Sequence, residues 1–120
     1  MVLPSLFVLL FGIVSAGTAA PTTVPVVLTE TRYAAGFEKP TAMLFLPDGR
    51  LLVSVQTGEV WSVPQGGGSA SLLLAVDTRA DYTGRGLLGL VLDPGFTANG
   101  YLYLYYTRFS DGEYRNVIER

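Results

Sequence analysis

One stretch punctuated by glycine and proline, residues 84–103, most constrains what this chain can fold into. Gly84, Gly86 and Gly89 spell the G-x-G-x-x-G pattern of a dinucleotide-binding loop, which needs a strand before it and a helix after it to hold a pyrophosphate. Only three residues separate the last glycine from an Asp-Pro pair, and Pro94 disfavours helix at its own position and at the residue before it. The stretch therefore predicts a short apolar strand, a turn and a second strand.

The N-terminal part of the chain has the composition of an export signal. The first 29 residues carry no charged side chain, residues 6–14 are almost entirely apolar, and small residues follow at 15–20. This layout is typical of a secretory signal peptide. We therefore expect residues 1–20 to be a signal peptide and residues 21–120 to be the folded part of a secreted or periplasmic protein.

An uncleaved membrane anchor is the alternative for the same segment, because no Lys or Arg precedes the apolar run. The run is shorter than the ~20 residues that a spanning helix needs, and Pro4 and Gly12 interrupt the segment. We expect no stable membrane span. Residues 21–29 contain two prolines and predict an extended leader.

Charge and composition exclude several classes of function. The chain has 10 acidic and 8 basic side chains, mixed in sign, and its net charge of −2 without a basic cluster argues against a nucleic-acid partner. The absence of Cys excludes a disulfide framework and thiol catalysis. The absence of His removes the commonest general base, the Ser–His pair and most zinc sites from these residues.

Short apolar runs separated by turn residues make up most of the remaining sequence. Pro, Asp and Gly at 47–49 predict a turn, and residues 56–59 predict a tight hairpin. Beyond the leader, no window shows the apolar stripe of a helix. The expected fold class is therefore all-β and antiparallel. The strands are expected near residues 42–46, 51–55, 60–63, 71–76, 90–92 and 101–105.

Two of these strand pairs resemble each other. The pair that starts near Leu44 and continues at Leu51 is matched by a pair starting near Leu90 and continuing at Tyr101, with offsets of 46 and 50 residues. A repeat of about 40 to 50 residues made of four short strands is the period of a β-propeller blade, and four to eight blades close a ring. We therefore expect about two blades here, and expect the chain to be an N-terminal part of a longer protein.

Two segments resemble the glucose/sorbosone dehydrogenase family. Residues 33–41 followed by 45–53 are similar to the opening of that family, and residues 86–96 followed by 99–103 are similar to a more specific stretch, Gly-Leu-Leu-Gly to Asn-Gly-Tyr. The family contains the soluble pyrroloquinoline-quinone (PQQ) sugar dehydrogenases and relatives such as the hedgehog-interacting proteins. The resemblance covers about residues 31 to 119.

This resemblance implies a secreted six-bladed propeller with PQQ and calcium at the centre of its top face. It implies oxidation of an aldose hydroxyl at C1 to a lactone, with hydride passing to the quinone, an electron acceptor as second partner and a histidine as base. That histidine, the basic residues that bind the cofactor and the calcium ligands belong to downstream motifs of the family. No catalytic, cofactor-binding or metal-binding residue is carried over to this chain, and its oligomeric state stays open.

Two positions depart from the family pattern. Family members often carry Glu-Arg-Gly or Gln-Gly-Gly before the Gly-Leu-Leu-Gly, and the Glu or Gln approaches the sugar pocket, whereas this chain has Gly84, Arg85 and Gly86. The missing side chain at position 84 weakens the inference of a glucose-type substrate. Family members usually have His-Pro where this chain has Asp93-Pro94, and we expect a turn residue to replace another at little cost.

Arg85 is the candidate substrate-binding residue. It either lines the mouth of the pocket and meets a sugar hydroxyl or the anionic cofactor, or it is a solvated turn residue that pairs with a nearby carboxylate such as Asp81. Asp77 and Asp81 lack the dense oxygen-ligand spacing of a calcium loop, so turn chemistry explains both. The alternating tyrosines at 101, 103 and 105 share one face of a strand and predict packing between neighbouring blades.

Two functions from different classes follow. The first is the N-terminal part of a secreted PQQ-dependent aldose dehydrogenase, for which this stretch alone is expected to be inactive. The second is a non-catalytic extracellular propeller that binds protein or glycan, because fold alone does not fix function. A strand-end His with Arg, Lys and Asn facing the central channel, all downstream of Arg120, would favour the enzyme.

Overall fold

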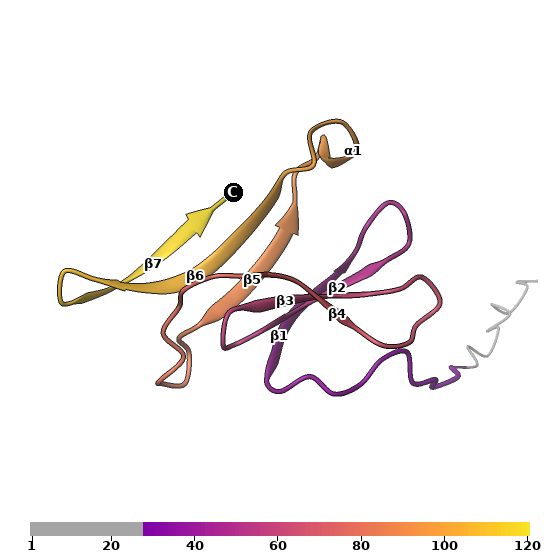
Figure 1. Ribbon diagram of the computed structural model, residues 1–120, viewed down its shortest axis with the longest axis horizontal. Helices are drawn as coiled ribbons and strands as arrows, with labels where there is room; N and C mark the ends of the chain where they lie inside the picture. The colour runs from indigo at the N-terminus through magenta and orange to yellow at the C-terminus, as the bar shows by residue number, and fades with distance from the viewer. Residues whose placement is uncertain (1–27) are drawn as a thin grey trace, which may run out of the picture.

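The computed structural model describes residues 28–120, which form seven β-strands and one short helix (Figure 1). The predicted signal peptide, residues 1–20, lies outside the described residues, as does most of the predicted leader. The all-β prediction is confirmed for the part described. In chain order the elements are β1 (Pro40–Phe45), β2 (Leu51–Val55), β3 (Glu59–Val63), β4 (Ser71–Ala75), β5 (Leu87–Leu92), α1 (Phe96–Asn99), β6 (Leu102–Ser110) and β7 (Glu113–Glu119).

The first sheet has the strand order β1-β2-β3-β4, and every neighbouring pair is antiparallel. The predicted turn between β1 and β2 is closed by Leu46, whose N–H donates to the carbonyl of Arg50 at 2.8 Å. Asp48 accepts a hydrogen bond from the Arg50 N–H at 3.1 Å. Gly58 gives the β2–β3 turn its positive φ of 114° and donates to the Val55 carbonyl at 3.0 Å. Local turn chemistry therefore produces a meander.

The second sheet has the order β5-β6-β7, also antiparallel throughout. Asp93 holds the β5–β6 connection, because its carboxylate accepts hydrogen bonds from Gly95 N–H and Asn99 Nδ2, both at 2.8 Å, and from the Tyr103 hydroxyl at 2.9 Å. These three donors hold the pKa of Asp93 below its ordinary value, with Asn99 the largest cause. The replacement of the family's His by Asp93 thus keeps a turn residue, as expected.

The two sheets pack face to face and enclose one apolar core. β5 lies beside β1 and β2, so the first strands of the two sheets are neighbours (Figure 1). Val60 and Leu87 are 0% exposed, and Leu52 and Tyr106 are 1% exposed. The Tyr106 hydroxyl is satisfied in this core, since it donates to Glu119 at 2.6 Å and accepts from Arg108 at 2.8 Å. The burial of these apolar side chains between the two sheets holds the sheets together.

The outer faces of both sheets stay partly open. On the first sheet, Tyr33 and Phe37 cover part of the outer face, but Met43 is still 72% exposed. On the second sheet, Tyr105 and its cross-strand partner Ile118 are 39% and 71% exposed. Leu102, Leu104 and Tyr106 of β6 face the core, so Tyr103 and Tyr105, which alternate with them, face away from it. Their predicted partner, a neighbouring blade, is not among residues 28–120, and that prediction stays untested.

The structure differs from the expected strand set in three main places. β7 was not expected, β5 begins at Leu87 rather than near residue 90, and β6 extends to Ser110 rather than ending near residue 105. The only helix among the described residues has four residues, which agrees with the argument that no helix of useful length fits after Gly89. Within residues 28–120 no helix has the length and hydropathy to cross a membrane.

Candidate functional site

Three connections lie toward one end of the two sheets, where the β6–β7 hairpin extends beyond the other two (Figure 1). They are the β2–β3 turn at 56–58, the β4–β5 connection at 76–86 and the β6–β7 turn at 111–112, and we call this end the loop end (Figure 1). The β1–β2 turn, the β3–β4 loop and α1 lie at the opposite end. Lys39 and Arg85, which come just before β1 and β5, also lie at the loop end. The sequence candidate Arg85 is therefore placed among the connecting loops.

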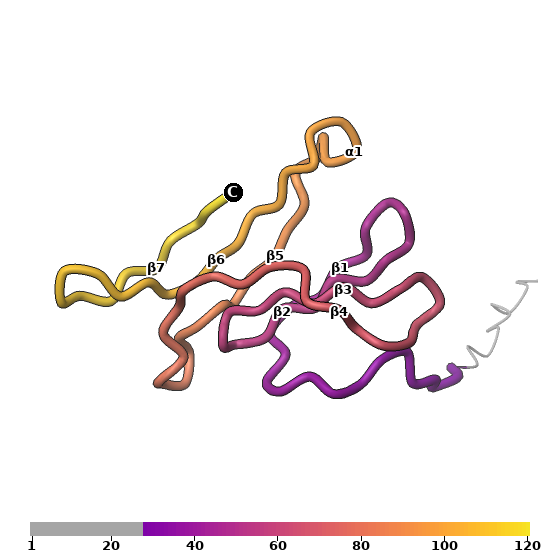
Figure 2. Tube along the Cα trace, in the orientation of Figure 1, coloured from indigo at the N-terminus to yellow at the C-terminus, as the bar shows by residue number. Residues whose placement is uncertain are grey.

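Backbone hydrogen bonds fix the β4–β5 connection to both sheets (Figure 2). Leu87 N–H donates to the carbonyl of Gln56 at 3.0 Å, and Thr107 N–H donates to the carbonyl of Gly86 at 3.0 Å. The side chain of Gln56 adds a bond from Nε2 to the Arg85 carbonyl at 2.8 Å. Gln56 thus holds the residues on both sides of Gly86, which makes the backbone around Arg85 a rigid support.

The Arg85 side chain lies between two tyrosines and a carboxylate. Its guanidinium carbon is 3.5 Å from the centroid of the Tyr114 ring and 5.4 Å from that of Tyr82. Its Nη1 is 3.5 Å from Oδ1 of Asp81, and the Tyr114 hydroxyl donates to Oδ2 of the same carboxylate at 2.9 Å. The cation–π contact and the shared carboxylate restrict the guanidinium to one position. The structure therefore brings Arg85 and Asp81 together, while Asp77 makes no side-chain hydrogen bond within the described residues.

The pKa of Asp81 lies below its ordinary value of 3.8, chiefly because the Tyr114 hydroxyl donates to the carboxylate and secondly because of Arg85. Burial acts in the opposite direction but is outweighed. The carboxylate is therefore ionised at neutral pH and forms an exposed ion pair with the Arg85 guanidinium. This pair and the Tyr114 ring hold the guanidinium at the loop end, where it can still donate hydrogen bonds.

Asp81 is expected to contribute a pH-dependent part of the stability of the full-length protein. Because its pKa is lower in the folded state, its contribution is complete above the unfolded value of 3.8 and disappears as the pH falls through the folded value. Asp81→Asn should lower the melting temperature by at most a few degrees at pH 6, since the pair is solvent-exposed. The difference should vanish in acid. Asp77→Asn is the matched control, because Asp77 makes no side-chain hydrogen bond within residues 28–120, and it should leave the melting temperature at pH 6 nearly unchanged.

Gly84, where the chain departs from the family pattern, has a left-handed backbone and open space around it. Its φ is +89°, and a Cβ at this position would meet no atom within 4 Å. The loop surface beside Arg85 is therefore open where family members often carry Glu or Gln. Solvent or a ligand can reach the backbone at this point.

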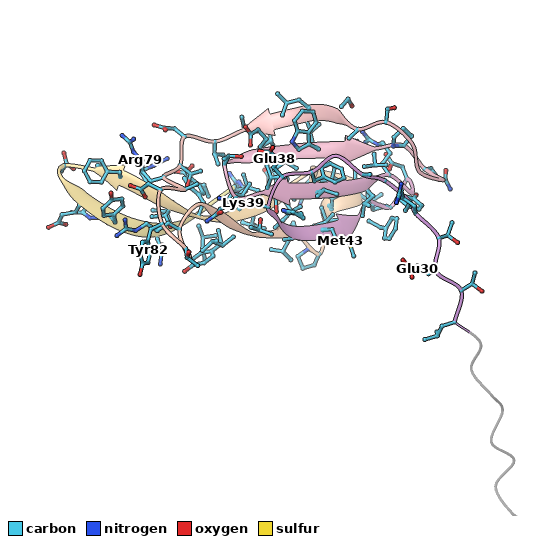
Figure 3. The ribbon with its side chains drawn as sticks, turned by 90° about the horizontal axis from the view of Figure 1, so that it is seen from below. Glu30, Glu38, Lys39, Met43, Arg79 and Tyr82 are labelled. Atoms are coloured by element: carbon cyan, nitrogen blue, oxygen red, sulfur yellow. The ribbon has the colours of Figure 1, made fainter. Side chains whose placement is uncertain are left out.

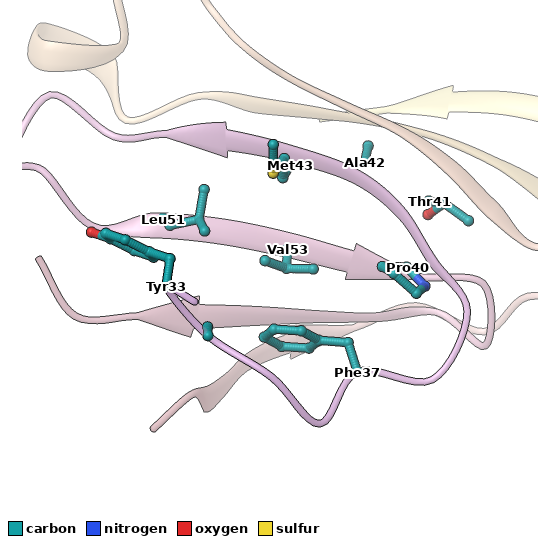
Figure 4. A pocket seen from close by; sticks show the side chains of 9 residues that line it. Tyr33, Phe37, Pro40, Thr41, Ala42, Met43, Leu51 and Val53 are labelled. Atoms are coloured by element: carbon teal, nitrogen blue, oxygen red, sulfur yellow. The ribbon is translucent and has the colours of Figure 1, made fainter. Parts of the chain in front are cut away.

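A hollow of about 390 Å³ lies on the outer face of the first sheet (Figure 4). Tyr33 and Phe37 form one wall, and Met43, Leu51 and Val53 form another. None of the side chains that line it is a carboxylate or a cation. This hollow offers apolar packing and no acid–base chemistry.

The described residues do not fit PQQ or its calcium. No group of three carboxylates, His or Cys lies close enough to hold a metal within residues 28–120. A quinone with several carboxylates also needs cations to bind it. At the loop end Arg85 is paired with Asp81 and Arg79 lies over the Phe109 ring at 5.4 Å. Lys39 is therefore the one cation there with neither a carboxylate nor a ring as its partner among residues 28–120 (Figure 3). No chemical step is therefore assigned to these residues through the cofactor.

Sequence reasoning identified Arg85 and its carboxylate partner but missed Gln56 and Tyr114. Gln56 was expected only as a turn residue, although its side chain fixes the Arg85 loop. Tyr114 lies in β7, a strand whose first four residues, 113–116, are all polar or exposed and give no apolar alternation. Only the pairing of β7 with β6 brings this tyrosine to the loop end.

Comparisons with known proteins agree with the arrangement of strands. The family model for glucose/sorbosone dehydrogenase matches residues 37–120. Among solved structures, a putative oxidoreductase (glucose dehydrogenase) from Thermus thermophilus is 33% identical with a TM-score of 0.62, covering 71% of this chain and 24% of that one. The PQQ-bound aldose sugar dehydrogenase of Streptomyces coelicolor is 29% identical with a TM-score of 0.60, covering 72% and 25%. No curated protein matches the chain.

The chain spans about a quarter of the length of each of these two structures. The family match covers most of the chain. It includes the second stretch on which the resemblance was based, residues 86–103, and the first stretch from residue 37 onward. The two antiparallel sheets correspond to part of a sugar dehydrogenase propeller. This chain belongs to the glucose/sorbosone dehydrogenase family.

Proposed function

We propose that this chain supplies the first two blades of a secreted or periplasmic six-bladed propeller that oxidises an aldose with PQQ as the electron acceptor. The observation that carries the proposal is the likeness to a PQQ-bound aldose sugar dehydrogenase over 72% of this chain. When bound, PQQ supplies the redox chemistry by taking a hydride from the sugar. The calcium ligands, the catalytic base and the residues that bind PQQ then lie outside this chain.

Arg85 has a binding role in this proposal. It is part of the loop end, where the residues that precede the first strand of each sheet lie, and β1 and β5 are neighbours. If the first strands line the central channel, the residues that precede them border its opening. Arg85, held by Asp81 and Tyr114, then presents its guanidinium to a sugar hydroxyl at the pocket mouth.

The test uses the full-length protein, expressed from the complete reading frame and loaded with PQQ and Ca²⁺. We expect reduction of an electron-accepting dye that depends on both the cofactor and an aldose. Residues 21–120 expressed alone serve as the control, and should be insoluble or partly folded and show no dye reduction, because two open sheet faces remain.

Two results would contradict the proposal. A loaded full-length protein that reduces no dye with any aldose would favour the non-catalytic, protein- or glycan-binding propeller. A soluble monomer of residues 21–120 that melts cooperatively would contradict the propeller assignment itself. The two failures are distinguishable, because the first concerns activity and the second concerns folding.

A further inference from the structure

Asn99 and Gly100 form an Asn-Gly pair in the β5–β6 connection. In such a pair the backbone nitrogen of the glycine can attack the side-chain carbonyl carbon of the asparagine, because glycine has no side chain to hinder the approach. The new C–N bond closes a succinimide ring, and the side-chain nitrogen leaves as ammonia with the proton of the glycine N–H. Water from the solvent then opens the ring and gives aspartate or isoaspartate. Asparagine counts among the thermolabile residues.

Burial does not protect this pair, because both residues are exposed. Asn99 is the last residue of α1, and Gly100 follows it as the C-cap with a φ of 66°. The only other asparagine of the chain, Asn116, precedes Val117, whose branched side chain crowds its own backbone nitrogen. Of the two asparagines, Asn99 is therefore the one whose sequence context favours succinimide formation.

Hydrogen bonds occupy all three groups that would take part in the reaction. Nδ2 of Asn99, the nitrogen that would leave, donates to Oδ1 of Asp93 at 2.8 Å. Oδ1 of Asn99 accepts from the Tyr101 N–H at 2.8 Å. The Gly100 N–H donates to the Phe96 carbonyl at 2.7 Å. Attack needs a rotated side chain and a glycine nitrogen without its proton, so these bonds must break before the reacting atoms can align.

Asp93 anchors this arrangement. Its Oδ1 also accepts from the Gly95 N–H at 2.8 Å, and its Oδ2 accepts from the Tyr103 hydroxyl at 2.9 Å. The carboxylate is therefore fixed both to the turn and to β6, so it cannot follow Asn99 when that side chain rotates. The same carboxylate opposes the product, since an aspartate at position 99 would bring a second negative charge to an oxygen that now accepts a hydrogen bond.

We propose that Asn99 is a deamidation site that the Asp93 carboxylate keeps closed. Deamidation then proceeds only through a local opening of the β5–β6 connection, in which the Asn99 side chain leaves Asp93. The converted residue cannot restore the lost hydrogen bond, so the connection stays open after the reaction.

The test follows Asn99 in the full-length protein by peptide mass spectrometry during incubation in mildly alkaline buffer. Trypsin cuts after Arg85 and Arg108, so the peptide between them contains no asparagine other than Asn99, and isoaspartate in it marks the succinimide route. We expect the folded protein to deamidate at Asn99 at least about tenfold more slowly than the guanidinium-unfolded chain, because the open state is populated less than about a tenth of the time.

Asp93→Ala should raise the rate at Asn99 in the folded protein about tenfold, the effect of losing one hydrogen bond to a charged group. Asp48→Ala is the matched control, because Asp48 is also a turn carboxylate at the same end of the sheets but bonds to Arg50 instead. It should leave the rate at Asn99 unchanged. Melting temperatures confirm that each variant folds, and an unchanged rate at Asn116 shows that the rest of the second sheet stays closed.

Two results would overturn the proposal directly: a folded protein that deamidates at Asn99 as fast as its unfolded chain, or equal rates in the wild type and Asp93→Ala. A rise in Asp48→Ala as large as in Asp93→Ala would show general loosening and would overturn it as well. If Asp93→Ala does not fold, Tyr103→Phe replaces it, because this variant removes one bond that fixes the carboxylate. It should raise the rate severalfold. An unchanged rate in Tyr103→Phe would then contradict the role of Asp93.

Discussion

Replacing Gly86 with alanine is expected to destabilise the full-length protein by about 3 to 5 kcal/mol, the sum of backbone strain, overpacking and a lost hydrogen bond. Gly86 has a φ of +110°, and a Cβ there would lie 2.2 Å from the carbonyl oxygen of Gln56. That oxygen accepts the bond from Leu87 N–H that attaches β5 to the β2–β3 turn. The alanine therefore separates the two sheets at their junction.

Gly84→Ala is the matched control for this substitution. Gly84 also has a positive φ, of +89°, but no atom lies within 4 Å of the added Cβ. It should cost only about 1 kcal/mol, the backbone contribution alone. The midpoint of urea unfolding measures both variants. Equal losses for the two alanines would show that the contact with Gln56 does not hold the sheets together, and would contradict the role given to Gly86.

The first sheet could be predicted from sequence because its signals are local. The strand at 51–55 was placed at its observed bounds, since turn residues border it on both sides. The match between the pairs starting at Leu44 and Leu90 also anticipated that each pair begins a sheet. Both predictions depend on residues adjacent in the chain, where turn chemistry and apolar runs decide the backbone.

The loop end could not be predicted in the same way. Tyr114 reaches Arg85 because β7 pairs with β6 over its full length, a pairing that leaves no mark in the polar residues 113–116. The left-handed backbone of Lys39 also leaves no mark in the sequence, because the hydrogen bond from the Gln56 N–H to its carbonyl comes from a neighbouring segment of the first sheet, as the bond from Thr107 to Gly86 does in the second sheet. Contacts between residues distant in sequence depend on how the sheets pack, and no local pattern records them.

The outer face of the second sheet, which carries Tyr103 and Tyr105, was predicted from the alternation of residues along a strand, and the repeat explains why this face is open. Alternation alone placed the tyrosines at 101, 103 and 105 on one side of a strand and the leucines on the other. The structure buries the leucine side and leaves the tyrosine side open. An open apolar face on each outer side is the expected shape of a wedge from a ring, because each blade packs between two others.

Ile118→Asp gives that interpretation a sharp test in the full-length protein. Ile118 is 71% exposed here, and a substitution at an exposed position changes stability by only about 0.5 kcal/mol. If a third blade covers the outer face of the second sheet, the same carboxylate is buried without a partner. The free energy of unfolding should then fall by about 3 kcal/mol or more, and the variant could fail to fold or could aggregate.

Leu73→Asp is the control, because Leu73 is also exposed, at 47%, but lies in the edge strand β4 at the point where the register with β3 shifts. It has no cross-strand partner in the pairing of β3 with β4 and lies in the first sheet, so a blade on the second sheet does not cover it and its substitution should remain nearly neutral. Chemical unfolding of the two variants separates the alternatives by magnitude. If the chain is part of a ring, Ile118→Asp should lose much more unfolding free energy than Leu73→Asp, since only Ile118 would face the next blade. Two small and equal effects would mean that the second sheet faces solvent in the complete protein and that no blade packs on it.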